Sequence, residues 1–408
     1  MGPLSGLKVL DLTHVMAGPT CTLMLADMGA DVIKIERNPG GDDSRHSVPP
    51  KIGDEAASFL MMNRNKRGIV VDLKTAGGKK IMRRLIASAD VLVENFAPGV
   101  MDRLGFGYQA LRQDHPALIY CSLSGFGRTG PYQDRRGFDL MAQAMSGIMS
   151  FTGDGPDGPP VKCGAPLSDI TAGLLAAMGI LAAYAHRLKT GEGQWVETSL
   201  FEAALVQTYW QSAIALATGV APRAMGSAHP LNAPYQAFQT SDGWIVVGGA
   251  NRKQWRLLLD AIDAPELADD PRFADNAARM ANLKALETEL ATRFRTQTSS
   301  HWLARLDQKG VPSGPVYDML QALADPQTAA RQMVVEIEHT TLGAVKTIGL
   351  PVKFSATPGK LRRGAPLFGE HTRDVLAEYG FGNDEIAALE QEGAVVAPKA
   401  GAGRQKVA

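Results

Sequence analysis

One short segment combines side chains that can do chemistry with a place where chemistry is favoured. Residues 162–173 read KCGAPLSDITAG, and the Ser168-Asp169 pair comes just before a long apolar helix predicted over 168–188. Ser and Asp commonly cap helices, which requires no catalytic role. On position alone, the favoured interpretation is a helix cap with Asp169 in the first turn. The alternative is that the helix N-terminus keeps Asp169 ionised, as a permanently charged oxygen nucleophile able to attack acyl centres.

Further candidates follow predicted strands. Arg37 comes after DVIKIE (31–36), Lys74 comes after the strand that ends near Leu73, and Asn95-Phe96 come after DVLVE (90–94). Ligands of α/β sheets bind at the carboxyl ends of strands, so these residues are candidate ligand contacts. Each could equally be a surface loop residue.

Other catalytic motifs are weak or absent in the sequence. The stretch 125–130 matches GxGxxG but leads into a predicted loop, and no acidic residue follows near 145–150, which argues against a dinucleotide fingerprint. The acidic turn at 152–160 lacks the Glu that closes a calcium loop. The histidines show no HxxxH spacing and no GxSxG is present, so no metal site or serine triad is predicted.

Composition narrows the class of protein. The 408 residues carry 42 Lys plus Arg and 42 Asp plus Glu, a balance that argues against nucleic-acid binding. The N-terminus does not resemble a signal peptide, and the longest apolar run, 174–185, is shorter than a membrane span of about 20 residues. Three scattered cysteines fit reduced thiols. We therefore expect a cytoplasmic protein that binds neither membrane nor nucleic acid.

The pattern of elements predicts an α/β fold. Strands alternate with helices through the first 130 residues, which implies βαβ units and a parallel sheet. Apolar helices are predicted at 168–188 and 200–218. A hairpin at 237–248 and amphipathic helices then form a second unit. We expect a large domain from 1–222 and 330–408, a small α+β domain from 223–329, and disorder in residues 399–408.

Several segments together resemble the family III CoA-transferases. They are LKVLDLTHVMAGP (7–19), GADVIKIERNPGGDDSR (29–45), NRNKRGIVVDLKTAGGKK (63–80), DVLVENFAPG (90–99), SLSGFGRTGPY (122–132), LSDITAG (167–173) and APLFGEHT (365–372). The resemblance implies a Rossmann-like large domain, an interlocked homodimer and a nucleophilic Asp169. It also implies that coenzyme A is substrate and product, that no separate cofactor is used, and that aspartyl anhydride and aspartyl-CoA thioester intermediates form.

The same resemblance assigns the contacts to CoA. Val15, Met16 and Ala17 match the residues that line the pantetheine channel, although Met16 stands where formyl-CoA transferase has Gln. The contacts to the rest of CoA correspond to Arg37, Leu73, Lys74, Asn95, Phe96, Arg103, Leu104 and Arg136.

Substrate choice and alternatives also follow from the resemblance. Related α-methylacyl-CoA racemases carry a proton-transferring His where this chain has Phe138, which argues against racemisation. A silent CoA-binding protein is the other alternative. Residues 226–238 and 243–251 are more similar to the succinyl-CoA:glutarate subgroup, without the glycine run of oxalate enzymes, so a C4–C6 dicarboxylate and succinyl-CoA or a similar donor are expected. The predicted substrate contacts are His14, Arg45, His46, Phe138, Gly226 and His229.

Overall fold

The computed structural model describes residues 1–398, and the predicted disorder of 399–408 lies outside the described residues. Its contacts define two compact units. Unit 1 comprises 1–146, 163–207 and the chain from 326 onward, and unit 2 comprises 147–162 and 208–325. The predicted domain boundaries stay a prediction; the contact-defined units differ from them by grouping 147–162 and 208–222 with unit 2 and 326–329 with unit 1.

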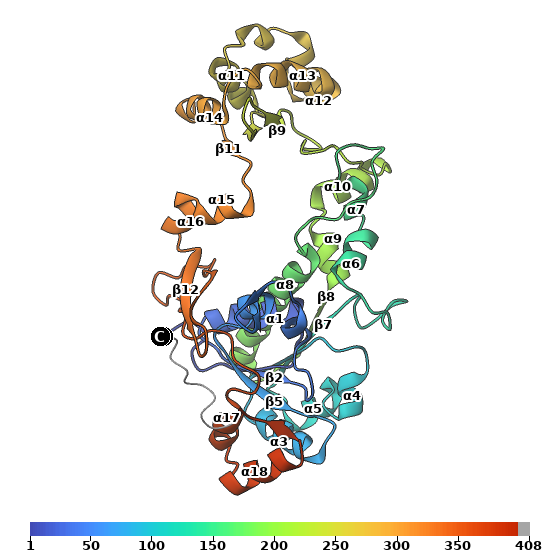
Figure 1. The fold of residues 1–408 in the computed structure, drawn as a ribbon. Coiled ribbons are helices and arrows are strands. Elements are labelled where there is room, and N and C mark those ends of the chain that lie inside the picture. Colours follow the sequence, from blue (N-terminus) through green and yellow to red (C-terminus); the bar gives the residue numbers. More distant parts are fainter. Residues whose placement is uncertain (399–408) are drawn as a thin grey trace. The chain divides into compact units, whose positions relative to one another are not determined.

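Unit 1 is built on a mostly parallel sheet of seven strands (Figure 1). Their order is β14-β5-β2-β1-β6-β7-β8, with only β14 antiparallel to its neighbour. The strands are β1 (Lys8–Asp11), β2 (Asp31–Glu36), β5 (Lys66–Val71), β6 (Val91–Glu94), β7 (Ile119–Ser124), β8 (Trp195–Ser199) and β14 (Val395–Val396).

The strand order identifies where this sheet changes direction. Numbered along the chain, the parallel strands lie in the order 3-2-1-4-5-6, which is the doubly wound arrangement. The switch point therefore falls between β1 and β6, which pair directly through Val9 and Val91. The sequence prediction of an α/β fold with a parallel sheet is confirmed.

Helices cover the sheet and bury their apolar sides. A core cluster joins the strands to α3, α5, α17 and α18, and includes Leu10, Ile33, Ile69, Leu85 and Leu376. The C-terminal helices thus return to the N-terminal strands, as the red and blue elements of Figure 1 show. The helices of this unit include α1 (Ala17–Asp27), α2 (Ala57–Met62), α3 (Ala76–Ile86), α4 (Val100–Leu104), α5 (Tyr108–Asp114), α6 (Asp139–Met145), α8 (Leu167–Thr190), α9 (Leu200–Val206), α16 (Pro326–Ala330), α17 (Thr372–Glu378) and α18 (Asn383–Gln391).

Helix α8 is long and apolar enough to cross a membrane by length and composition alone. Core helices pass the same test, and α8 packs against α1, β7, β8 and α9. Two short hairpins complete unit 1. They are β3 (Lys51–Ile52) with β4 (Glu55–Ala56), and β12 (Val334–His339) with β13 (Gly343–Ile348).

Unit 2 has its own core beside a small antiparallel sheet. Phe238, Trp255, Phe273, Phe294 and Trp302 pack together there. The sheet has the order β11-β10-β9, and the elements are α7 (Ile148–Phe151), α10 (Tyr209–Thr218), β9 (Tyr235–Gln239), β10 (Trp244–Gly248), α11 (Arg252–Ala261), α12 (Asn276–Ala281), α13 (Leu283–Phe294), α14 (Ser299–Gln308), β11 (Ser313–Pro315) and α15 (Met319–Ala324).

One helix expected from the sequence is two helices. The apolar stretch 200–218 breaks between α9 and α10, at Gln207 and Thr208. Thr208 leaves helical geometry with φ −103° and ψ 18°, and its buried hydroxyl bonds the Ser212 hydroxyl over 2.6 Å. The division between the two units falls at the same peptide bond, so the continuous apolar pattern spans two separate units.

Candidate functional site

Asp169 lies in the first turn of α8 and does not cap that helix. The helix begins at Leu167 after Pro166, which makes no side-chain capping bond. The predicted cap at this pair was therefore wrong, because the helix starts before both residues, whereas the first-turn position of Asp169 is confirmed. The buried Ser168 backbone N–H instead donates to Asp139 Oδ1 over 2.9 Å.

A second carboxylate, Asp139 at the start of α6, adds to the effect of burial on the pKa of Asp169. Asp139 is fixed by the Ser168 bond and by Gln143, whose Nε2 donates to Asp139 Oδ2 over 2.7 Å. Burial, and then repulsion from Asp139, raise the pKa of Asp169 to about 6. The expectation of a permanently charged Asp169 was therefore wrong. Desolvation and a like charge outweigh the helix N-terminus, and Asp169 titrates just below neutral pH.

Helix α1 approaches α8 one turn beyond Asp169. A Cβ on Gly173 would lie 2.6 Å from the carbonyl oxygen of Ala17 and 2.8 Å from Cβ of Thr20. Only glycine permits this separation, because other residues would force the two helices apart. The Gly of LSDITAG therefore brings the start of α1, where the CoA contacts Val15–Ala17 are predicted, next to the helix that carries Asp169.

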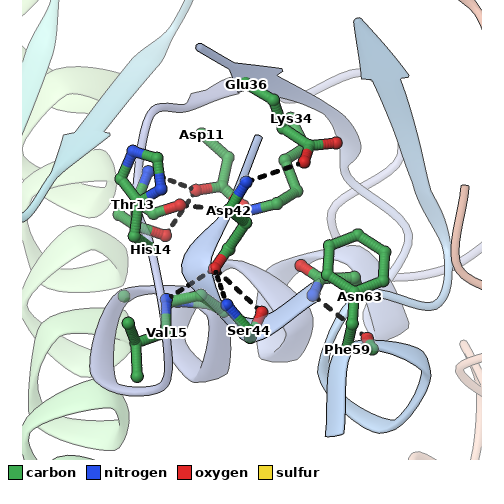
Figure 2. Close-up of polar contacts among 12 residues, drawn as sticks. Asp11, Thr13, His14, Val15, Lys34, Glu36, Asp42, Ser44, Phe59 and Asn63 are labelled. Atoms are coloured by element: carbon green, nitrogen blue, oxygen red, sulfur yellow. Dashed lines mark hydrogen bonds and ion pairs between the residues drawn. The ribbon is translucent and has the colours of Figure 1, made fainter. Parts of the chain in front are cut away.

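The segment before α1 has an unusual backbone held by buried side chains (Figure 2). Val15 adopts φ +68°, a left-handed conformation that strains a β-branched residue by about 1–3 kcal/mol. Its N–H donates to Asp42 Oδ1 over 3.0 Å. The Thr13 N–H donates to Asp11 Oδ1, and the Thr13 carbonyl accepts from Lys34 Nζ, both over 2.9 Å. The Val15 side chain is 42% exposed.

Charges beneath this segment are buried and paired. Lys34 Nζ lies 2.8 Å from Asp42 Oδ2, and both side chains are fully buried. Burial opposes the charge of Lys34, but Asp11, Asp42 and Glu36 outweigh it and raise the pKa of Lys34. Burial also opposes ionisation of Asp42, yet Lys34 holds the pKa of Asp42 well below its usual range. Both groups therefore remain ionised at neutral pH.

The switch point of the sheet brings two predicted ligand residues together. Asn95, which follows β6, accepts the His14 N–H through Oδ1 and donates through Nδ2 to the His14 carbonyl, each over 2.9 Å. The His14 ring lies 5.5 Å from the Phe96 ring. Burial, followed by Lys34, lowers the pKa of His14, so its imidazole is neutral at pH 7. Ligands bind at such switch points in doubly wound sheets.

The other predicted CoA contacts lie along strand ends and nearby loops. Exposed Arg37 pairs with Asp43, and exposed Lys74 precedes α3. Leu73 and Leu104 pack half-buried against the core, while Arg103 on α4 and Arg136 are exposed. A cavity of about 250 Å³ opens beside the residues after β6. Its lining includes Glu94, Pro98, Met101, Tyr108, Arg128 and Trp195.

The side chains of the predicted substrate contacts differ in their exposure and in the bonds they already make within the protein. Arg45 donates to both oxygens of Glu36 over 2.7 Å and lies 3.6 Å above the Phe59 ring, which favours a structural role. His46 Nε2 bonds the Gly40 carbonyl, and Phe138, at the start of α6, is 67% exposed.

Gly226 and His229 belong to unit 2, where the His229 ring packs between Trp210 and Tyr235. Within residues 1–398, no three His, Cys, Asp or Glu side chains gather as a metal site requires.

Sequence reasoning missed Asp139, Lys34 and Asp42. Asp139 directly follows Phe138, the residue that separated transferase from racemase, but nothing local showed that it faces Asp169. Lys34 is the basic residue of the strand DVIKIE, whose other residues are apolar or acidic. A lysine within a buried parallel strand requires a buried partner, and that requirement was the available signal.

Comparison with known proteins identifies the family. The model of CoA-transferase family III matches residues 4–372, so the chain belongs to this family. Human succinyl-CoA:glutarate CoA-transferase is 40% identical over 92% of this chain and 86% of its own length. Acetyl-CoA:oxalate CoA-transferase of Acetobacter aceti is 44% identical over 93% of this chain and 96% of its own.

A solved structure agrees with the fold. A CAIB/BAIF family protein from Brucella suis is 41% identical, with a TM-score of 0.82 over 93% of this chain and 99% of that one. The protein is therefore a CoA-transferase that acts between an acyl-CoA and a carboxylate.

Proposed function

We propose that the protein moves CoA from succinyl-CoA or a similar acyl-CoA to a C4–C6 dicarboxylate, with Asp169 as the covalent nucleophile. The observation that carries the catalytic part is a partly buried carboxylate whose pKa is raised to about 6. Such a carboxylate is more basic than an ordinary aspartate yet is ionised at neutral pH, which suits a nucleophile.

The reaction proceeds through two kinds of covalent intermediate. An Asp169 oxygen attacks the thioester carbonyl, the C–S bond breaks, and CoA thiolate leaves an aspartyl–acyl anhydride. The thiolate then attacks the Asp169 carbonyl carbon and releases the donor acid, which gives an aspartyl-CoA thioester. The acceptor carboxylate attacks the aspartyl carbonyl of that thioester, the C–S bond breaks, and CoA thiolate leaves a second anhydride. The thiolate then attacks the acceptor's acyl carbon, which forms the new acyl-CoA and releases the Asp169 carboxylate. No net proton is gained or lost, and no resident cofactor is needed.

The neighbours of Asp169 serve distinct parts of this cycle. Asp139 keeps Asp169 basic through repulsion. The segment Val15–Ala17, which Gly173 brings against α8, would guide the pantetheine arm toward the nucleophile. Phe138 has no titratable group, which supports transfer over proton exchange at the α-carbon.

The acceptor rests on similarity. The relative from humans is named for succinate and glutarate, which supports a C4–C6 dicarboxylate. The bacterial relative named for oxalate is 44% identical, so oxalate with acetyl-CoA is the second candidate. Neutral His14 at the switch point is a candidate donor to the substrate carboxylate.

We also propose that the active protein is an interlocked cytoplasmic homodimer, with no part for membranes or nucleic acid. Helix α10 buries none of its residues within unit 2, and Tyr209 and Leu216 are 72% and 89% exposed. Apolar helices of this kind are covered by a partner in stable assemblies.

The direct test measures new thioesters. The protein is incubated with succinyl-CoA or acetyl-CoA and a panel of acids, and acyl-CoA products are identified by mass spectrometry. Succinyl-CoA with a C4–C6 acid should be the best pair, whereas a preference for oxalate would replace the proposed acceptor. Asp169→Ala should abolish transfer, and Asp157→Ala in an exposed turn is the matched control. Turnover retained in Asp169→Ala would overturn the mechanism. Hydroxylamine should also convert Asp169 to a hydroxamate only when acyl-CoA is present.

A further inference from the structure

We propose that the buried Lys34–Asp42 pair is a positioning device that holds Val15 in its left-handed conformation and so shapes the binding segment for acyl-CoA. The proposal rests on the proposed function for its ligand. It assigns a role to two residues that touch neither the nucleophile nor, by any contact above, the substrate.

Side chains bond most of the backbone N–H and carbonyl groups between Thr13 and Val15. Between Thr13 and Val15, successive backbone groups bond side chains instead of a helix or strand partner, and all but the nearby Asp11 come from distant parts of the chain. The Thr13 and Val15 N–H groups bond Asp11 and Asp42, and the Thr13 carbonyl bonds Lys34. Asn95 takes both backbone groups of His14. A segment whose three N–H groups and first two carbonyls are all bonded keeps one conformation before any ligand arrives.

The backbone of Val15 is strained. Val15 is a β-branched residue at φ +68°, where such residues are rare. A conformation of this kind persists only where the surroundings over-determine it, and it commonly marks a functional segment. Asp42 supplies the bond at this residue, since its Oδ1 accepts the Val15 N–H and also the Ser44 N–H and hydroxyl. Figure 2 shows Asp42 at the centre of these contacts.

The two carboxylate oxygens of Asp42 bind different partners. One oxygen bonds the backbone at Val15, while the other lies 2.8 Å from Lys34 Nζ. The Asp42 N–H donates to Glu36 Oε2 over 3.0 Å, which fixes the loop that carries Asp42. Lys34 in turn bonds the Thr13 carbonyl. The ion pair therefore holds the segment at Thr13 through Lys34 and at Val15 through Asp42. When Asp42→Asn keeps its oxygen on the Val15 N–H, its NH₂ group faces Lys34.

The test separates positioning from general stability. Asp42→Asn should raise the KM for acyl-CoA and the Kd for CoA by about tenfold or more, the scale of a charged hydrogen bond, with kcat changed less than threefold. The matched control is Asp27→Asn. Asp27 forms another buried ion pair, 2.6 Å from Arg64, and bonds none of residues 13–17. Asp27→Asn should lower stability and leave KM and Kd within twofold.

A double-mutant cycle tests the backbone argument. Glycine adopts positive φ without strain, so Asp42→Asn should raise Kd clearly less in a Val15→Gly background than in the native chain. Equal effects in both backgrounds would overturn the link to Val15. A parallel loss of kcat, or an equal rise of KM in Asp27→Asn, would show a merely structural pair and overturn the proposal.

Hydrogen exchange makes the outcome independent of transferase activity. Without CoA, peptides covering residues 13–17 should lose protection in Asp42→Asn and keep it in Asp27→Asn. Protection unchanged in Asp42→Asn would refute the positioning role. If the native protein binds CoA but transfers it to no acid, the proposed function fails while Kd and exchange still decide this inference.

Discussion

Replacing the nucleophile should make the protein more stable, and the gain should depend on pH. Asp169 has a pKa of about 6 in the folded protein against an ordinary value of 3.8. The difference of about 2 units corresponds to about 3 kcal/mol between the two protonation states. Asp169→Asn removes the charge, and therefore removes the cost of burying it beside Asp139.

The sign follows from proton binding. Between pH 4 and pH 6 the native state binds more protons at this position than the unfolded state, so the native chain loses stability as pH rises through this window. Below pH 4 both states are protonated and the contribution is fully present. Above pH 6 this contribution of protonated Asp169 to stability is lost. Asp169→Asn should therefore raise the free energy of unfolding by about 3 kcal/mol at pH 8 and by only about 0.5 kcal/mol at pH 4.

Urea unfolding at the two pH values measures this difference. Far-UV circular dichroism follows the helices of both units, whereas tryptophan fluorescence follows mainly unit 2, because every tryptophan except Trp195 lies there. A transition seen by circular dichroism and not by fluorescence therefore belongs to unit 1. Exposed Asp157→Asn is the control and should change stability by less than about 0.5 kcal/mol at both pH values. Destabilisation at pH 8, or an equal gain at pH 4 and pH 8, would refute the assignment of a destabilised, ionised Asp169.

Three further predictions concern other contacts. Asp139→Asn should shift the acid limb of the pH–rate profile below pH 6, since the repulsion that raises the pKa of Asp169 is gone; an unmoved limb would contradict it. Gly173→Ala should destabilise unit 1 by about 1–3 kcal/mol and raise the KM for acyl-CoA, because the new Cβ meets the Ala17 carbonyl; a silent variant in urea unfolding and kinetics would show that α1 yields freely. Arg279→Met should destabilise unit 2 by at least about 3 kcal/mol, followed by tryptophan fluorescence, since its guanidinium bonds the carbonyls of Ala233, Ala250 and Phe273; a smaller loss would mean that those carbonyls find other donors.

Local patterns in the sequence predicted the order of most elements and marked Asp169 as the proposed nucleophile. Strand β2 was predicted with its bounds, because alternation and turn residues on both sides are local signals. The motif LSDITAG marked Asp169, and the strand ends marked Asn95. These features depend on residues close together in the chain, and a linear pattern records them.

The charge state of Asp169, the backbone conformation of Val15 and the partner of Arg45 depend on tertiary structure. The pKa of Asp169 depends on burial and on Asp139, a residue thirty positions earlier that only folding brings near. The left-handed Val15 depends on Asp42, which bonds its N–H, and on Asn95, which holds the neighbouring His14; both lie in loops that follow other strands. Arg45, an apparent substrate cation, is held by Glu36. Charge and strain arise from long-range neighbours and desolvation, and no local pattern of residue types contains them.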